Sequence, residues 1–286
     1  MAFRTVIIST HCKLEYSLNY LVYKTIDETK RINLDEIHTV IIESTAVSIT
    51  SALMVELIEK KIKVIFCDLK HNPSFELVPY YGDSITTRRI NEQLSWRQEI
   101  KDLVWKRIVK DKIQKQAYNI YDISIKEQLL KYMEEVEKGD VTNREGHAAK
   151  IYFNNVFGKG FVRNSDNEIN IYLNYGYSIL LSQINRVIVS KGYLTQVGIH
   201  HKNDFNQFNL SCDLIEPFRP LVDATAKQVN KENYKEIMVN MLHKRIKIGG
   251  EYQLLVNAIT IYCTSVFRAL NTENIDEIVD IERYEL

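Results

Sequence analysis

Short β-branched and aromatic runs, separated by polar positions, dominate the first eighty or so residues. Such runs fit the pleated, half-buried surface of a sheet, so they predict strands over 5–9, 14–20, 38–43 and 64–67. Before the last of these, apolar residues recur at helical spacing, which predicts an amphipathic helix capped by Ser48 and continuing to Ile58. The pattern therefore predicts a small β-rich domain, 1–82, with one helix packed on it.

The periodicity changes after a break marked by Pro79, Gly82 and Asp83. From 84 to 119 the chain has no proline or glycine and its apolar residues recur every three to four positions, so one long helix is predicted. The same signals predict helices over 125–137, 143–157, 169–190 and from about 210, and two more around a Gly249–Gly250 break. The expected fold class is α+β with two domains, of which the larger, 83–286, is all-α.

Composition narrows the possible function classes. The 286 residues carry 37 Lys and Arg against 37 Asp and Glu, so the net charge is zero and no global basic field attracts nucleic acid. The four cysteines form no Cys-x-x-Cys pair, and no apolar run reaches the length of a membrane helix. We therefore expect a cytoplasmic protein with reduced cysteines and without a signal peptide, a structural zinc site or a membrane partner.

One stretch departs from this neutrality. Between residues 88 and 115 the chain has four acids and nine basic residues: Arg88, Arg89, Arg97, Lys101, Lys106, Arg107, Lys110, Lys112 and Lys115. A run of charge is usually a solvated helix face. Spaced Lys and Arg can also contact the DNA backbone, because phosphate contacts require no recognition of bases. Both interpretations stay open, and Trp96 and Trp105, which interleave with the charges, are expected in the core.

Two histidines and two acids form the strongest candidate site. His200 and His201 follow Gly198. Glu216 comes fifteen residues after His201, with Asp213 one turn earlier on the same face of a predicted helix. A buried cluster of like charges is costly unless a cation compensates it, which favours a divalent metal site. The alternative is an ordinary helix start, in which Asp213 favours the helix dipole and Glu216 is solvated.

Local signals also position two of the acids. Thr142 or Asn143 can cap a helix, and Glu145 would then lie in its first turn. Pro217 directly follows Glu216 and disfavours helical geometry at the glutamate. We therefore expect the second helix to kink or restart there, which would aim the Glu216 side chain away from the helix.

Four sequence blocks together resemble the CRISPR-associated spacer integrase, the "Cas one" family. In chain order they are Glu145-Gly-His-Ala-Ala-Lys-Ile-Tyr-Phe, Asn174-Tyr-Gly-Tyr, Gly198-Ile-His-His and Asp213-Leu-Ile-Glu-Pro-Phe-Arg-Pro. The resemblance extends over nearly the whole chain, and its variants look like the type II branch. It implies a metal-dependent DNA endonuclease and integrase that joins the 3′-OH ends of short DNA fragments into a CRISPR repeat array by transesterification.

The resemblance also implies roles for the candidate residues. In the family a helix-borne glutamate, a histidine and a second acid hold a metal ion, which here implies Glu145, His201 and Glu216, with Asp213 in a supporting catalytic role. The family's Gly-x-x-His spacing selects His201 over His200. Two carboxylates and an imidazole suit Mg²⁺ or Mn²⁺, and zinc is not excluded.

The implied partners are spacer DNA, the CRISPR leader and repeat, and a second copy of the chain bound through the β-rich domain. A small companion CRISPR-associated adaptation protein and other type II CRISPR proteins complete the set. Two other functions stay open: a non-catalytic DNA-binding scaffold, and a general metal-dependent nuclease acting on branched DNA. The presence of all three expected ligands counts against the scaffold. His147 is expected either at the surface or beside the site in a supporting position, and not as a ligand, and Arg219 either contacts DNA or makes an internal ion pair.

Overall fold

The computed structural model describes residues 4–69, 71, 73–80, 85–163 and 165–284. The chain divides into two compact units, Met1–Tyr80 and Tyr81–Leu286. The domain boundary expected between 82 and 83 falls within 81–84, which lies outside the described residues.

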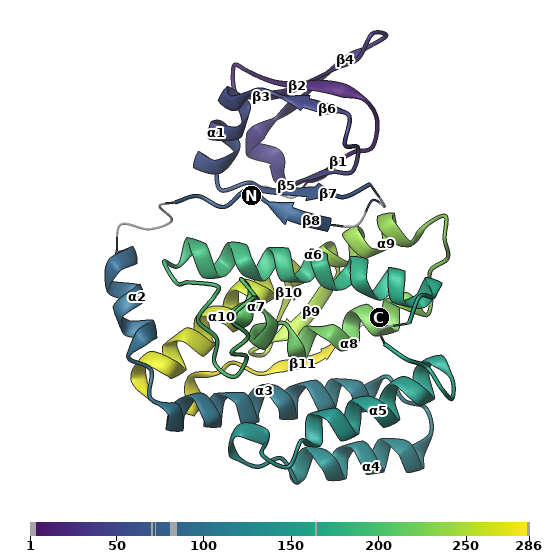
Figure 1. Ribbon diagram of the computed structural model, residues 1–286, viewed down its shortest axis with the longest axis vertical. Coiled ribbons are helices and arrows are strands. Elements are labelled where there is room, and N and C mark those ends of the chain that lie inside the picture. Colours follow the sequence, from purple (N-terminus) through teal and green to yellow (C-terminus); the bar gives the residue numbers. More distant parts are fainter. Residues whose placement is uncertain (1–3, 70, 72, 81–84, 164, 285–286) are drawn as a thin grey trace. The chain divides into compact units, whose positions relative to one another are not determined.

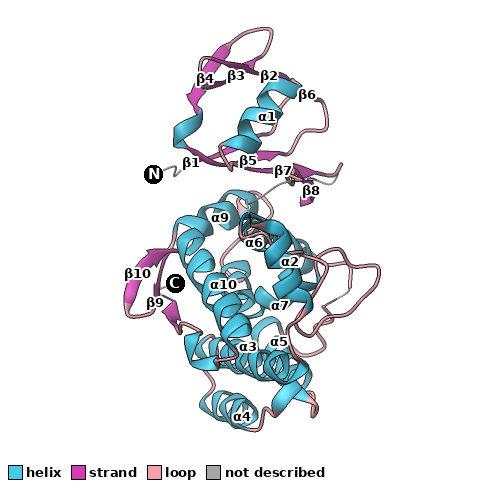
Figure 2. Cartoon of the chain, turned by 90° about the vertical axis from the view of Figure 1, so that its left-hand side faces the viewer, coloured by secondary structure: helices cyan, strands magenta, loops and turns pink. Residues whose placement is uncertain are grey.

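The described part of the first unit contains two four-stranded sheets and one α-helix (Figure 1). One sheet has the order β1 (Arg4–Ile8), β5 (Ile37–Ile42), β7 (Lys63–Cys67), β8 (Pro73–Glu76), with β8 antiparallel to its neighbour. The other has the order β4 (Thr29–Asn33), β3 (Tyr20–Lys24), β2 (Cys12–Ser17), β6 (Val47–Ile49). Helix α1 (Ser51–Glu59) lies between the two sheets (Figure 2) and contacts β2 and β7, one strand of each. It buries Leu53 and Leu57 in the core. The predicted β-rich domain with one packed helix is confirmed.

Two local predictions in this unit are wrong. The strand expected over 14–20 is a hairpin, because Leu18 and Asn19 take the left-handed conformation, with φ of 49° and 65°, and reverse the chain between β2 and β3. Alternation of apolar residues continues through this tight turn and therefore hides it. The helix cap is Thr50, whose side chain accepts a hydrogen bond from the Leu53 amide, whereas Ser48 lies in β6.

The second unit is built around two long helices, α3 (Gln98–Tyr118) and α6 (Glu168–Ser190). Helix α3 contacts α4 (Ile123–Glu134), α5 (Arg144–Phe157), α8 (Arg219–Ala226) and α10 (Leu255–Thr272). Helix α6 contacts α7 (Asn209–Leu214), α8, α9 (Tyr234–Asn240) and α10. A Cβ at Gly176 of α6 would lie 2.5 Å from Cγ1 of Val222, so the missing side chain permits close packing of α6 on α8. Of the helices that the structure describes, none combines the length and apolar composition of a membrane span.

The first helical segment of this unit differs from the sequence prediction. The long helix expected over 84–119 is two helices, α2 (Thr86–Leu94) and α3, separated at Trp96. The Trp96 indole N–H donates to Oδ1 of Asn271, 2.8 Å away, so this distant partner holds the break. Trp96 and Trp105 are both buried, as expected.

The α+β class is confirmed, but the larger unit is not all-α. Its described part includes a three-stranded sheet of β10 (Glu251–Leu254), β9 (Arg245–Ile248) and β11 (Ile281–Tyr284). Gly249 and Gly250, with φ of 58° and 84°, form the turn of the β9–β10 hairpin rather than a break between helices. Ile246 and Ile248 are buried and alternate with basic residues, the two-residue period that four-residue strands show too briefly to be recognised.

Candidate functional site

Glu145 is placed by the start of α5. Asn143 is the N-cap, as one of the two expected alternatives, and its side chain accepts a hydrogen bond from the Gly146 amide. The buried carboxylate of Asp140 accepts the amides of Arg144 and Glu145, at 2.8 and 3.0 Å. These bonds satisfy donors that a helix start leaves unpaired, and they fix the first turn from which the Glu145 side chain projects.

Glu216 is placed by an interruption of the helix. Helix α7 ends at Leu214, a 3-10 turn spans Glu216–Phe218, and α8 begins at Arg219. This restart confirms the prediction from Pro217. The side chain of Glu216 is 5% exposed, so its charge requires compensation inside the protein.

Both acids converge on Lys112, which α3 contributes. The Lys112 Nζ lies 2.5 Å from Oε1 of Glu145 and 2.5 Å from Oε2 of Glu216. The Arg219 Nε donates to the other oxygen of Glu216 over 2.8 Å. The two acids, 71 positions apart in sequence (216 − 145), are therefore brought to one shared cation.

Sequence reasoning missed this role of Lys112 and counted it among the charges of a helix face. One signal was available: Val104, Ile108 and Lys112 follow each other at intervals of four, which puts the lysine on the buried stripe of α3. A lysine on such a stripe is almost never buried unless it is paired.

The pKa shifts agree with a fully ionised cluster. Burial raises the pKa of Glu216, but the charges of Arg219 and Lys112 outweigh it and lower this pKa to about 2. Burial lowers the pKa of Lys112, but the Glu216 and Glu145 carboxylates outweigh it and raise this pKa. Because each shift favours the charged form, the pair stays ionised across the physiological pH range.

Asp213 organises the histidine loop. Its carboxylate is fully buried and accepts the amides of Ile199, His200 and His201 at 2.6, 3.1 and 3.1 Å. Nδ1 of His201 lies 2.6 Å from Oδ1 of the same carboxylate. Gly198 allows the loop to close, because a Cβ there would collide with the His201 carbonyl oxygen. Asp213 thus acts by holding the loop.

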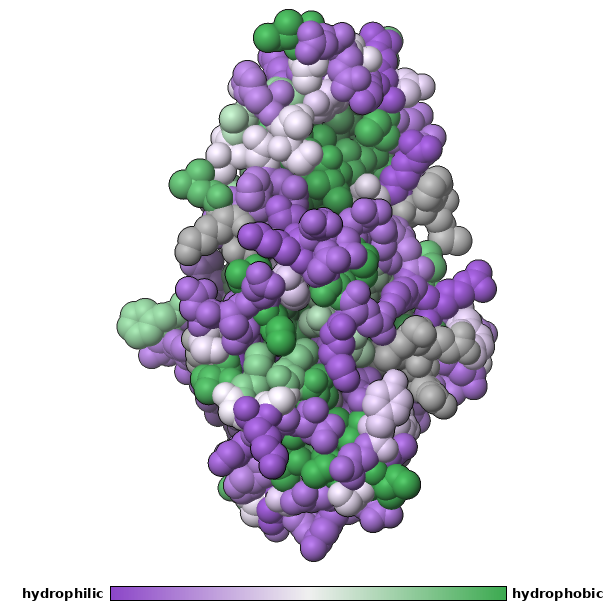
Figure 3. Space-filling model, turned by 90° about the vertical axis from the view of Figure 1, so that its right-hand side faces the viewer, coloured by the Kyte–Doolittle hydropathy of each residue, from purple (hydrophilic) through white to green (hydrophobic). Residues whose placement is uncertain are grey.

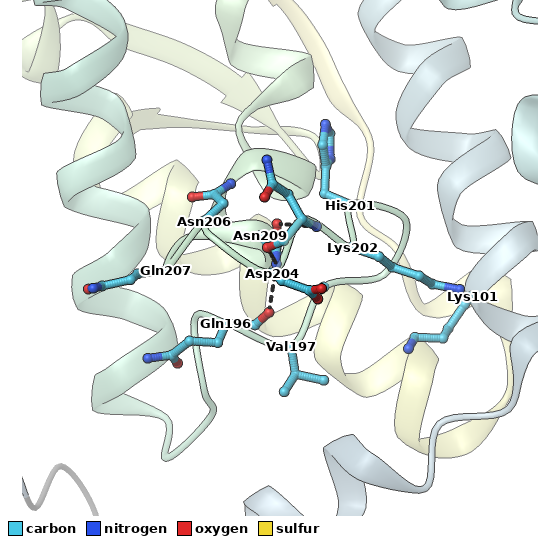
Figure 4. Close-up of a pocket in the computed structure, with 11 residues that line it drawn as sticks. Lys101, Gln196, Val197, His201, Lys202, Asp204, Asn206, Gln207 and Asn209 are labelled. Carbon is cyan, nitrogen blue, oxygen red and sulfur yellow. Dashed lines mark hydrogen bonds between the residues drawn. The ribbon is translucent and has the colours of Figure 1, made fainter.

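The two histidines have different surroundings. The His200 ring stacks on Trp105, with centroids 4.3 Å apart and planes 2° apart. The His201 side chain is 40% exposed and lines a cavity of about 390 Å³ (Figure 4). The pKa of His201 is raised, first by its hydrogen bond to Asp213 and further by the charges of Glu216 and Glu145, against the effect of burial. The charges of both carboxylates that contact Lys112 therefore also act on the pKa of His201.

The donor chemistry fits a divalent ion. Glu145 and Glu216 supply carboxylate oxygens, which Mg²⁺ and Mn²⁺ prefer as ligands, and the buried Oε2 of Glu216 lies 2.5 Å from the Lys112 ammonium. Within the described residues, no three His, Cys, Asp or Glu side chains are drawn together tightly enough to form a metal-binding group. The ligand set of Glu145, His201 and Glu216 thus stays a prediction, with Lys112 between its two acids.

A network of aromatic and charged groups supports Arg219. Its guanidinium lies over the Tyr177 ring, 4.6 Å from the centroid, and Arg163 lies over the same ring at 5.0 Å. The Tyr177 hydroxyl donates to the buried carboxylate of Asp223. Arg219 therefore makes the internal ion pair that was one of its two expected roles. His147 is exposed, which is one of its two expected positions.

The basic stretch of 88–115 is mostly engaged in pairs. The ion pairs are Arg88 and Arg89 with Glu92, Arg97 with Glu273, Arg107 with Asp111 and Asp280, Lys110 with Glu134, and Lys112 with Glu145 and Glu216. Lys115 is buried. Lys101 differs, because it lines the cavity beside His201 together with Lys202 and the amides of Asn206 and Asn209 (Figure 4). Hydrophilic side chains also cover much of the face shown in Figure 3, interrupted by apolar patches.

Solved structures share this fold. A casposase bound to integration product has a TM-score of 0.77 and 18% identity, covering 99% of this chain and 96% of that one. A Cas1 protein from Thermotoga maritima has a TM-score of 0.77 and 17% identity, covering 93% and 97%. A chain of a Cas6-RT-Cas1–Cas2 complex has a TM-score of 0.75 and 18% identity, covering 99% of this chain and 36% of that one.

Sequence comparison identifies the family. The family model for CRISPR associated protein Cas1 matches residues 5–248. A CRISPR-associated endonuclease Cas1 from Neisseria meningitidis serogroup C is 29% identical over 303 residues, covering 100% of this chain and 99% of that protein. Another from Francisella tularensis subsp. novicida is 28% identical over 237 residues, covering 75% and 74%. The resemblance carried by the four sequence blocks is thereby confirmed, and the chain belongs to the Cas1 family of CRISPR-associated proteins.

Proposed function

We propose that this chain joins the 3′-OH ends of short DNA fragments into a CRISPR repeat array by transesterification, using Mg²⁺ or Mn²⁺ held by Glu145, His201 and Glu216. The family membership and the full-length match to a CRISPR-associated endonuclease support a nuclease or integrase role. The observation that carries the proposal is the convergence of Glu145 and Glu216, from two separate elements, on one cationic centre, the Lys112 ammonium.

The residues of the chain have distinct tasks in this reaction. Because the Asp213 carboxylate accepts, Nδ1 of His201 carries the proton, and Nε2 is left as the lone-pair donor for a metal. Arg219 keeps Glu216 ionised, and Glu145 approaches from α5. A bound divalent ion supplies neutralisation of the phosphoryl oxygens and stabilisation of the attacking and leaving oxygens.

The same proposal includes partners and location. DNA and a small companion adaptation protein are supported by the neighbours titled as a casposase bound to integration product and a Cas6-RT-Cas1–Cas2 complex.

A homodimer formed through the β-rich unit is supported by its open sheets, where Ile7 and Phe75 are 37% and 59% exposed on edge strands. Light scattering at micromolar concentration tests it, and a monomer contradicts it. Type II partners and a cytoplasmic location belong to the same proposal.

An integration assay tests the activity. Labelled short DNA fragments are incubated with a repeat-containing plasmid, with the companion protein and Mn²⁺ or Mg²⁺. Joined product is the expected result, whereas a mobility shift without chemistry indicates a scaffold and cleavage alone indicates a general nuclease. EDTA should abolish joining, and so should each of the variants Glu145→Ala, His201→Ala and Glu216→Ala. Combining two of these substitutions should cause no further loss, because loss of one ligand already disables the site. His200→Ala is the matched control and should retain joining.

A further inference from the structure

A cation already occupies the place that the two acids share. The Lys112 side chain is 8% exposed, and its Nζ lies within 2.5 Å of both Glu145 and Glu216. Arg219 contributes a second positive charge to Glu216. Two cations therefore balance two carboxylates before any ion or substrate is present. These pairings lower the cost of burying the charges, whereas removal of one partner would leave an uncompensated charge.

The two cations that balance the carboxylates also oppose the binding of a metal ion. A divalent ion held by the same carboxylates would add two positive charges beside Lys112 and Arg219, in a setting where repulsion is stronger than in water. A DNA phosphodiester carries the negative charge that the cluster would then lack. Ion and DNA therefore compensate each other electrostatically, and each favours the binding of the other.

We propose that Lys112 is the counter-ion of Glu145 and Glu216 and that it competes with the divalent ion while DNA is absent. When DNA binds, the Lys112 ammonium pairs with a phosphodiester instead and helps to position it. The inference rests on the proposed function, because it assumes that these two acids are metal ligands. By thermodynamic linkage, the coupling is reciprocal: DNA tightens metal binding by the same factor by which metal tightens DNA binding. Lys112 would thereby delay loading of the ion until a substrate is present.

Measurement of Mn²⁺ affinity tests this without any activity readout. Free Mn²⁺ is followed by electron paramagnetic resonance during titration of the full chain, with and without a short DNA duplex. For the wild type, the duplex should lower the Mn²⁺ Kd by about fivefold or more, in the usual range of allosteric coupling. Lys112→Met removes the charge while keeping much of the side-chain length. It should tighten Mn²⁺ binding of the DNA-free protein about tenfold or more, and the effect of DNA should shrink accordingly.

Lys115→Met is the matched control. Lys115 lies on the same helix and is also buried, but its Nζ donates to Oε1 of Gln114, 2.9 Å away, and not to Glu145 or Glu216. Its substitution should leave the Mn²⁺ Kd within about twofold of wild type and the effect of DNA intact. A general loss of buried positive charge on α3 would instead affect both variants alike, and that result would overturn the specific role of Lys112.

The inference also fails if wild-type protein binds Mn²⁺ equally well with and without DNA, or if folded Lys112→Met binds it no more tightly. Lys112→Gln replaces Lys112→Met if the latter does not fold, and the wild-type comparison decides if neither folds. These failures leave the proposed function standing when joining still requires Mn²⁺ and Glu145. Absence of Mn²⁺ binding together with undiminished joining in EDTA would overturn both.

Discussion

Asp213 holds His201 at both its backbone and its ring, since one carboxylate accepts the His201 amide at 3.1 Å and lies 2.6 Å from its Nδ1. The same carboxylate accepts the amides of Ile199 and His200. A single buried acid thus fixes the course of the loop and the orientation of one imidazole. In the proposed metal site, Asp213 would thus orient the His201 ligand without contacting the ion itself.

Asp213→Asn should therefore weaken the site through the loop. The amide group offers one acceptor oxygen in place of two, so buried backbone donors lose their partner, and the free energy of unfolding should fall by about 1–3 kcal/mol. Mn²⁺ affinity should fall with it, because the His201 ring is no longer held. Urea unfolding and Mn²⁺ titration measure the two effects. Asp276→Asn, at an exposed position outside this loop, is the control. Unchanged stability and affinity in Asp213→Asn would refute this role.

The two proposed ligand acids should differ in what they contribute to stability. Glu216→Gln leaves Lys112 and Arg219 in a buried site without their shared carboxylate, which should cost about 3–5 kcal/mol. Glu145 is 28% exposed, so water reaches its site and Glu145→Gln should cost about 1 kcal/mol or less. Urea unfolding should show a larger loss of stability for Glu216→Gln than for Glu145→Gln, although both variants should lose DNA joining. The reverse order would show that Lys112 depends mainly on Glu145.

Local chemistry explains which parts of the site could be predicted from sequence. The helix start that places Glu145 depends on Asn143, and the helix restart at Glu216 depends on Pro217. Each of these residues lies within two positions of the acid, so the sequence shows both signals directly. The bond from Lys112 to Glu145 spans 33 positions and the ion pair with Glu216 spans 104 (216 − 112), and no local signal specifies such a partner.

The same reasoning applies to the fold. Helices α3 and α6, of 21 and 23 residues without proline, were both predicted, although α3 begins at Gln98 and was expected to begin at 84. The break at Trp96 depends on Asn271, which lies 175 positions away, and was missed. The β9–β10 hairpin was missed for a different reason, because strands of four residues are too short for their alternation to be distinguished from a helix that ends at glycine.

Asp223 should give the stability of the protein a measurable pH dependence. Burial raises the pKa of its carboxyl from 3.8 to about 6, against hydrogen bonds from Tyr177 and Tyr152 that lower it. Between these two values the folded chain binds a proton that the unfolded chain has released, so stability falls as the pH rises from about 4 to about 6 and then levels off. The difference amounts to about 3 kcal/mol.

Asp223→Asn removes this titration, while its amide can still hydrogen-bond the two tyrosines. Urea unfolding of wild type and variant across a pH series should show a difference in free energy that grows in favour of the variant from about pH 4 to about pH 6. Other titrating groups cancel in this comparison because both proteins share them. A constant difference across the series would contradict the raised pKa.

The DNA track is expected beside the cavity rather than along the whole basic stretch. Lys101 and Lys202 both line the cavity next to His201, and the pKa of Lys101 is lowered by burial and by the charge of Lys202. Two ammonium groups that repel each other gain from an anion placed between them. By contrast, Arg97 and Lys110 already pair with acids, so a phosphate there would have to displace Glu273 or Glu134.

The double variant Lys101→Gln/Lys202→Gln should therefore weaken DNA binding for all sequences alike and lower the log–log salt slope by roughly two units, one for each phosphate that no longer meets an ammonium group. The matched variant Arg97→Gln/Lys110→Gln removes the same number of charges from α3 and the residue before it, and should change the slope little. Fluorescence anisotropy at several salt concentrations measures both. A larger effect in the second variant would place the track along the outer face of α3. Unchanged binding in both would direct the search to the basic residues Lys227, Lys244, Arg245 and Lys247, of which Lys247 already pairs with Glu282.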